Sequence, residues 1–101
     1  MNRVTHPPSP PATLPREQVH RITRALADPR RFDILKAIAA NNGAPCTALR
    51  ADFPITAPTM SHHLKELEAA GLIAGERDGK YMNLTFLRDT WNAYLAELNK
   101  L

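Results

Sequence analysis

Prolines and glycines divide this chain into short segments, and that division is the strongest constraint on its fold. Asp28-Pro29, Gly43, Pro54 and Gly71 each stand where a helical pattern breaks off. The residue before a proline avoids helical backbone angles, and glycine readily adopts the left-handed angles that end a helix. Because no helix between these points can exceed about four turns, the sequence predicts several short helices around one core.

Apolar residues recur every three or four positions within these segments, as they do on the buried face of a helix. Asp28 and Thr56 are suited to cap two of the helices, because their side-chain oxygens can accept bonds from free N–H groups. The predicted buried stripe of the second helix is Phe32, Leu35, Ile38 and Ala39. We expect helices in residues 16–27, 29–42, 44–53, 57–70 and 88–101.

Residues 72–86, between the last two helices, lose the helical pattern. Asp78-Gly79 stands between two short runs that alternate apolar and polar residues. This dipeptide between extended runs is a typical signal of a β-hairpin. The predicted fold class is therefore α+β and mainly helical, with four helices, a two-stranded hairpin and a last helix.

The length and composition indicate one small domain. The chain has 101 residues, of which 44% are hydrophobic and 23% charged. Residues 1–14 hold four prolines and almost nothing to bury, so we expect a disordered Pro-rich arm before a domain at residues 15–101. No apolar run approaches the ~20 residues of a membrane span, and the first residues lack the apolar middle of a signal peptide. We expect a cytoplasmic protein with no membrane contact.

The charge is modest overall but unevenly distributed. The formal net charge is +3, and six arginines in residues 1–31 face only Glu17 and Asp28. A concentration of positive charge favours a polyanionic partner. The arginines are Arg3, Arg16, Arg21, Arg24, Arg30 and Arg31.

Two adjacent histidines in the fourth predicted helix need separate interpretations. At about 100° per residue, Met60, Leu64 and Leu67 mark the buried side and His62 points nearly opposite. One metal bound by a single helix needs ligands three or four positions apart, so His62 and His63 are poorly placed to share one. Taken alone, His62 could be a solvated side chain, and His63 a half-buried one bonded to the backbone.

The order of elements around this helix suggests a contact with DNA. A short helix, a tight turn and a second helix form the layout of a helix-turn-helix, whose second helix enters the major groove. Pro58 and Lys65 share the outer side of that helix with His62, and Thr59 and Ser61 flank it. The hairpin that follows carries Arg77 and Lys80 near its tip, where they could contact phosphate as a wing does.

Three stretches in this order carry a specific resemblance: "ALADPRRFDILKAI", "TAPTMSHHLKELEAAGLI" and "ERDGKYMNL". From about His20 to the C-terminus, the chain resembles the ArsR-type (ArsR/SmtB) winged helix-turn-helix transcriptional repressors. The resemblance implies a homodimer on a two-fold-related operator that blocks transcription until an effector releases it. It places Thr59, Ser61 and His62 against bases or nearby phosphates. It also assigns Thr56 and Lys65 to the DNA backbone, and Arg77 and Lys80 to the wing contact.

The same resemblance implies dimer contacts by the first and last helices. The last helix carries an apolar stripe wider than so small a core should need, and a second copy would cover it. The alternative is that the stripe packs only on its own first helix. The predicted dimer interface is Val19, Ile22, Leu26, Trp91, Tyr94, Leu95 and Leu98, with Leu101 at the end of the stripe.

The sequence departs from the family at its sensor sites. Metal-sensing members carry a Cys-x-Cys pair in the helix before the recognition helix, and here Pro45 and Thr47 fall at those positions with Cys46 between them. One thiolate is too few for an arsenic or thiolate-rich zinc site. The other familiar site needs histidine on the last helix, which has none. We therefore expect no metal or cofactor. Cys46 is either a buried apolar residue or a redox sensor, and the effector is unknown.

Other functions fit less well. An enzyme would need a phosphate loop or a nucleophile–base pair, and Ser61 and His62 point about 100° apart on their helix, so we expect no catalysis. A winged helix can instead contact protein with the same face, and this remains the alternative. Arg3 could extend the arm to a minor groove, although a solvated tail fits better. Arg30 and Arg31 could reach phosphate or form internal ion pairs.

Overall fold

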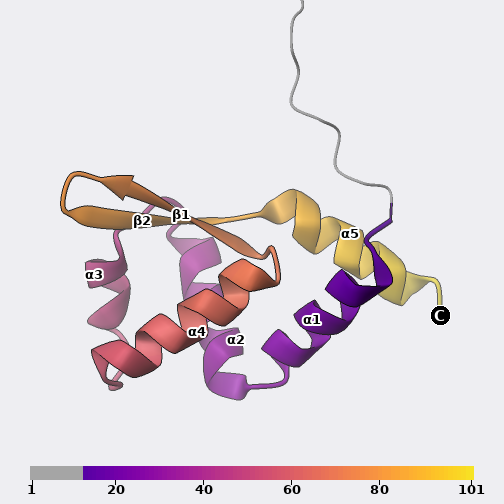
Figure 1. The fold of residues 1–101 in the computed structure, drawn as a ribbon, viewed down its shortest axis with the longest axis horizontal. Coiled ribbons are helices and arrows are strands. Elements are labelled where there is room, and N and C mark those ends of the chain that lie inside the picture. The colour runs from indigo at the N-terminus through magenta and orange to yellow at the C-terminus, as the bar shows by residue number, and fades with distance from the viewer. Residues whose placement is uncertain (1–12) are drawn as a thin grey trace, which may run out of the picture.

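The helices and strands of the computed structural model, which describes residues 13–101, follow the predicted order (Figure 1). The α+β, mainly helical winged helix-turn-helix fold is confirmed. In that part of the chain the elements are α1 (Arg16–Leu26), α2 (Pro29–Ala40), α3 (Cys46–Arg50), α4 (Ala57–Ala69), β1 (Ile73–Asp78), β2 (Tyr81–Phe86) and α5 (Arg88–Asn99).

The hydrophobic core is built where the helices and the root of the hairpin meet. Its largest fully buried side chains are Ile22 of α1, Ile34 of α2, Met60 and Leu67 of α4, and Leu72 before β1. Burying a side chain of this size stabilises the fold by roughly 1.5–3 kcal/mol. The core therefore fixes α4 against α1 and α2 at the same time.

The buried face of α2 differs from the predicted stripe. Ile34, Leu35 and Ile38 are buried, whereas the Phe32 side chain is 39% exposed, with the Lys36 ammonium 5.8 Å from its ring centre. The prediction for Phe32 was wrong because α2 packs against α1, α3, α4 and β2, and these neighbours together cover the side that carries Ile34.

The predicted helix caps are confirmed. The Asp28 side chain accepts hydrogen bonds from the backbone N–H groups of Arg30 and Arg31, and Thr56 accepts one from Thr59. Gly71 follows α4 with a φ of +80°, the left-handed angle that a glycine adopts at least cost. These caps set where α4 begins and ends.

The hairpin is confirmed, but its turn lies one residue later than predicted. Asp78 pairs with Tyr81, so the two-residue loop is Gly79-Lys80 rather than Asp78-Gly79. Gly79 has a φ of +62° and Lys80 does not have a positive φ, a combination found in type II′ turns. Lys80 is therefore at the very tip of the hairpin.

The root of the hairpin is bonded to the segment that joins α2 to α3. The Gly43 N–H donates to the Leu84 carbonyl over 2.8 Å, and the Leu84 N–H donates to the Ala44 carbonyl over 3.0 Å. Pro45 forms an isolated bridge with Asn83. β2 thus has β1 on one side and the α2–α3 connection on the other.

The start of the packed domain also differs from the prediction. Leu14, assigned to the arm, is 7% exposed and belongs to the core, so the packed region begins before Pro15. Residues 1–12 of the predicted arm lie outside the described part of the chain. Within residues 13–101, none of the helices has the length and apolar character needed to cross a membrane.

Candidate nucleic-acid interface

The helix α4 presents one polar, exposed side and one buried side. Met60 and Leu67 are buried with 1% and 0% exposure, as predicted, and Leu64 is half-buried. Six exposed residues of its N-cap and first three turns form what we call the α4 face. They are Thr56, Pro58, Thr59, Ser61, His62 and Lys65.

The α4 face combines fixed and free polar groups. The Thr56 hydroxyl lies 3.0 Å from that of Thr59, so the cap also orients the second threonine. Hydroxyl and imidazole groups can both donate and accept, which suits contact with base edges, and a lysine suits phosphate. The face can therefore bind a surface that is rich in both acceptors and negative charge.

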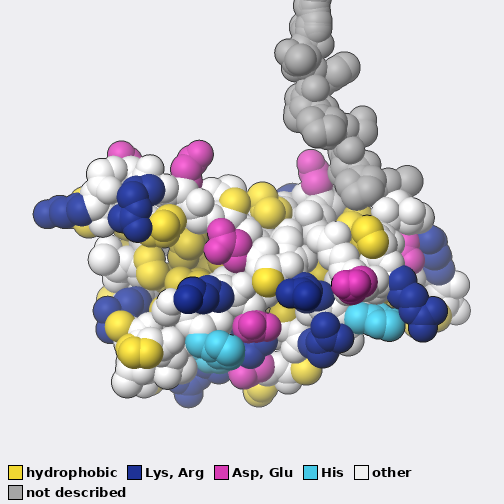
Figure 2. Space-filling view, in the orientation of Figure 1, with side chains coloured by type: hydrophobic (Ala, Val, Ile, Leu, Met, Phe, Trp, Pro, Cys, Tyr) yellow, Lys and Arg dark blue, Asp and Glu magenta, His cyan; other side chains and the backbone are white. Residues whose placement is uncertain are grey.

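The tip of the hairpin adds positive charge beside the α4 face. Arg77 and Lys80 are both exposed, and Figure 2 shows Lys and Arg side chains gathered at that tip. Tyr81 is also exposed there, and the Lys80 ammonium lies 5.7 Å from its ring centre. The exposure of Tyr81 was not predicted from the sequence, because it follows from the register of the hairpin.

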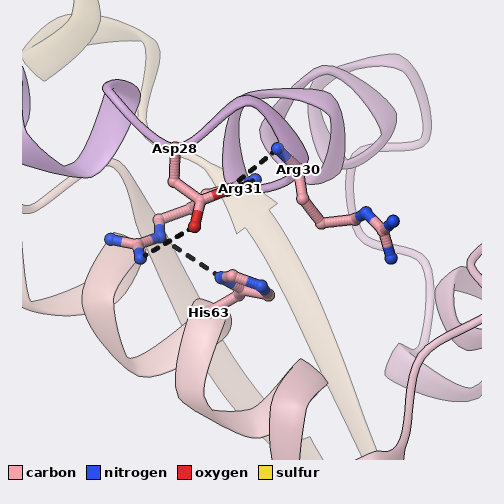
Figure 3. Close-up of polar contacts among 4 residues, drawn as sticks. All are labelled: Asp28, Arg30, Arg31 and His63. Atoms are coloured by element: carbon pink, nitrogen blue, oxygen red, sulfur yellow. Dashed lines mark hydrogen bonds and ion pairs between the residues drawn. The ribbon is translucent and has the colours of Figure 1, made fainter.

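Beneath the α4 face, His63 contacts α2 (Figure 3). The Arg31 Nε donates to His63 Nδ1 over 3.3 Å, and an Arg31 terminal nitrogen lies 3.6 Å from Asp28 Oδ2. His63 is 7% exposed, so it is buried rather than half-buried, and its partner is an arginine side chain rather than the backbone. Of the alternatives left open for Arg31, the internal ion pair is the one observed.

Burial and neighbouring charges shift two pKa values in this cluster. Burial lowers the pKa of His63 below its ordinary 6.5, with the positive charge of Arg31 acting in the same direction and Asp28 opposing. The hydrogen bond from the Arg31 N–H is the largest cause that lowers the pKa of Asp28 below 3.8. At neutral pH, His63 is therefore a neutral acceptor and Asp28 an anion.

The start of α4, α3 and the hairpin tip lie at one end of the molecule, and α1 and α5 lie side by side at the other (Figure 1). The end that carries α3, the start of α4 and the hairpin tip therefore has no part in packing α5. This separation allows one end to bind a ligand while the other contacts a second chain.

Comparison with known proteins gives this arrangement a family. Residues 26–76 match the family model described as "Helix-turn-helix domain". The chain is 33% identical over 88 residues to the transcriptional repressor SdpR of Bacillus subtilis, covering 81% of this chain and 94% of that protein. A homodimeric winged helix-turn-helix DNA-binding domain from Mycobacterium bovis, described as a possible ArsR-family regulator, has a TM-score of 0.69 and 26% identity. That match covers 83% of this chain and 79% of the other. The chain belongs to the ArsR family.

The fold agrees with this assignment over most of the chain. An ArsR-like regulator from Rhodococcus superposes with a TM-score of 0.74 at 21% identity, covering 83% of this chain and 78% of that one. At this identity the likeness shows the fold alone. The ArsR family and its named relatives identify the chain as a DNA-binding transcriptional regulator.

The predicted dimer residues of this ArsR-family chain lie on α1 and α5, and their exposure separates them into two groups. Ile22 is fully buried and Tyr94 is 5% exposed, and the Tyr94 hydroxyl lies 2.8 Å from that of Thr23. The hydrogen bond joins α5 to α1 within one chain, and neither Ile22 nor Tyr94 has much surface left for a partner. The exposed or half-buried ones are Val19, Leu26, Trp91, Leu95, Leu98 and Leu101.

The sensor chemistry of this ArsR-family chain is not evident at the positions where metal sensors carry their ligands. Cys46 is half-buried at the start of α3, and burial raises the pKa of its thiol. A thiol held protonated is a poor nucleophile and metal ligand. Among residues 13–101, no cluster of three or more His, Cys, Asp or Glu side chains is placed to hold a metal ion. The expectation that the chain uses no metal stays a prediction.

Proposed function

We propose that the protein is a homodimeric transcriptional repressor that binds an inverted-repeat operator. The observation that carries the proposal is the separation between a polar, partly cationic end and an end that exposes aliphatic side chains of α5. A DNA-binding end and a dimerisation end on one small domain are what a two-fold-symmetric DNA-binding protein requires. The relative SdpR is named a transcriptional repressor, which supports repression rather than activation.

In this proposal, the start of α4 enters the major groove. Thr59, Ser61 and His62 contact base edges, because they are the exposed groups of the first two turns that can both donate and accept. Thr56, Pro58 and Lys65 lie against the sugar-phosphate backbone at either side of the groove.

The hairpin is proposed to act as the wing. Arg77 and Lys80 bind phosphates beside the groove, and these contacts supply salt-dependent affinity rather than sequence preference. No ion pair among the described residues engages either side chain, so both are available to a polyanion.

The proposed dimer buries the exposed stripe of α5. Leu95 and Leu98 are 39% and 44% exposed, and Leu101 is at the end of the chain beyond them. Val19, Leu26 and Trp91 extend the apolar surface, while Ile22 and Tyr94 support it from within. A two-fold axis at this end would present two α4 helices to major grooves about 34 Å apart. We expect the protein to act in the cytoplasm, without a cofactor.

Fluorescence anisotropy tests the proposal directly. The purified protein is titrated into labelled duplex from its own promoter and into a scrambled duplex, at several salt concentrations and with zinc or a chelator. Tighter, salt-dependent binding to the promoter that does not respond to metal is the expected result. Weak and equal binding to both duplexes would overturn operator recognition and favour a winged-helix module that contacts protein.

A further inference from the structure

The buried contact between α2 and α4 links the start of one helix to the middle of the α4 face. Asp28 Oδ1 accepts the backbone N–H groups of Arg30 and Arg31, which fixes the direction of the carboxylate. Its other oxygen, Oδ2, lies 3.6 Å from the Arg31 guanidinium. The cap of α2 therefore also orients the arginine that reaches His63.

Few polar contacts hold α4 to the rest of the chain. Within residues 13–101, two side-chain hydrogen bonds join α4 or its C-cap to another helix. Gln18 of α1 donates to the Ala70 carbonyl at the C-terminal end, and Arg31 donates to His63 in the second turn. The bond to His63 is thus the polar contact nearest to the residues that face outward.

The contact has a defined geometry in a protected setting. The side chain of Arg31 is 12% exposed and that of His63 is buried, so water competes little for the bond between them. His62, the next residue, is exposed, and its ring centre lies 5.9 Å from that of His63. A shift of His63 would therefore also move His62, which belongs to the α4 face.

We propose that Arg31 and His63 are positioning residues for DNA recognition, which hold the first two turns of α4 in the orientation that reads the operator. This inference rests on the proposed function. Neither residue needs to touch DNA. Asp28 acts one step further back, because it orients the guanidinium.

The chemistry of the contact makes it sensitive to pH. His63 Nδ1 accepts the hydrogen bond from Arg31 Nε–H only while Nδ1 carries no proton itself, and an imidazolium would place two donors face to face. The charged groups that act on His63 are Asp28, Arg30 and Arg31 around the start of α2 and His62 on α4. Because the pKa of His63 lies below its unfolded value of 6.5, the bond is intact at neutral pH and is lost as pH falls through that lowered value.

Three substitutions separate this role from simple packing. His63→Asn can keep an acceptor oxygen near the position of Nδ1 but does not titrate, and His63→Leu fills the site with an apolar side chain that accepts nothing. Arg31→Lys keeps the charge but removes the Nε donor. If the pair acts as a unit, Arg31→Lys should weaken binding in the wild-type background and have little further effect beside His63→Leu.

Operator binding is the first measurement, by anisotropy from pH 8 down to the lowest pH at which both proteins stay folded. At pH 7.5 we expect His63→Leu to weaken binding about fivefold and His63→Asn to bind nearly as the wild type. As the pH falls through the lowered pKa of His63, the wild type should lose affinity relative to His63→Asn. The two proteins differ only at position 63, so the comparison isolates that side chain. Parallel pH profiles would overturn the proposal.

A measurement without DNA keeps the inference separate from the proposed function. Amide hydrogen exchange at pH 7.5 should be faster in residues 59–63 of His63→Leu, with the core of α1 and α2 unchanged, and restored in His63→Asn. Exchange that is unchanged, or faster throughout the domain, would show that the pair does not position α4. If the wild type and the variants all fail to prefer the operator but show this local exchange pattern, operator recognition is refuted. The positioning role of the pair would still stand.

Discussion

Removing the two cations of the wing gives the sharpest quantitative test of the DNA-binding end. Arg77→Ala with Lys80→Ala removes two exposed side chains per protomer, so four in a dimer. Each phosphate contact contributes about 0.9 to the slope of log affinity against log salt concentration, so the slope should fall by about 3.6. Between 50 and 200 mM salt, the wild type should lose about 150-fold more affinity than the variant.

The assay is anisotropy on operator duplex across that salt range. The variant should fold normally, because exposed substitutions usually change the free energy of unfolding by less than about 0.5 kcal/mol. Lys36→Ala with Arg88→Ala is the matched control. It removes the same amount of positive charge from other parts of the fold. Lys36 of α2 lies over the ring of Phe32, and Arg88 of α5 lies over the ring of Phe86.

The two slopes together decide the question. A reduced slope in the wing variant and an unchanged slope in the control place the wing on DNA. An unchanged slope in the wing variant would refute the reasoning. Equal reductions in both would show an effect of net charge without a wing contact.

Three further substitutions test other parts of the molecule. His62→Ala should lower the preference for operator over scrambled duplex about tenfold, measured by competition anisotropy, whereas equal loss on both duplexes would make His62 a phosphate contact. Leu98→Asp should raise the dimer dissociation constant at least about 30-fold in analytical ultracentrifugation, and an unchanged sedimentation profile would remove α5 from the interface. Asp28→Asn should lower the unfolding temperature near pH 6. The difference from the wild type should disappear below the lowered pKa of Asp28, because the stabilising carboxylate is lost as pH falls through that value; a constant difference would contradict this.

Local signals predicted the fold well. Asp28, Thr56 and Gly71 act on their own first or last helical turn, so their roles depend on neighbours within four residues. The outward direction of His62 follows equally from its spacing to Met60 and Leu67. The side of a helix on which a residue lies follows from its spacing to nearby residues, so it can be predicted without the rest of the chain.

Features that depend on distant partners were not predictable in the same way. Both Phe32 and Ile34 lie among apolar residues of α2, and which one is buried depends on where β2 and α4 pack. The partner of His63 lies 32 residues away, and its identity required the observed fold. Leu14 was assigned to the arm because the prolines before it dominate the local composition.

The bonds between β2 and residues 43–45 have a consequence for the length of DNA that one protomer can cover. The hairpin root and the start of the helix-turn-helix share a ladder, so the wing cannot swing independently of α3 near that point. These bonds constrain the distance between the α4 face and Lys80 within each chain. Inserting a base pair within a half-site should therefore disrupt recognition, even where every contacted base is kept.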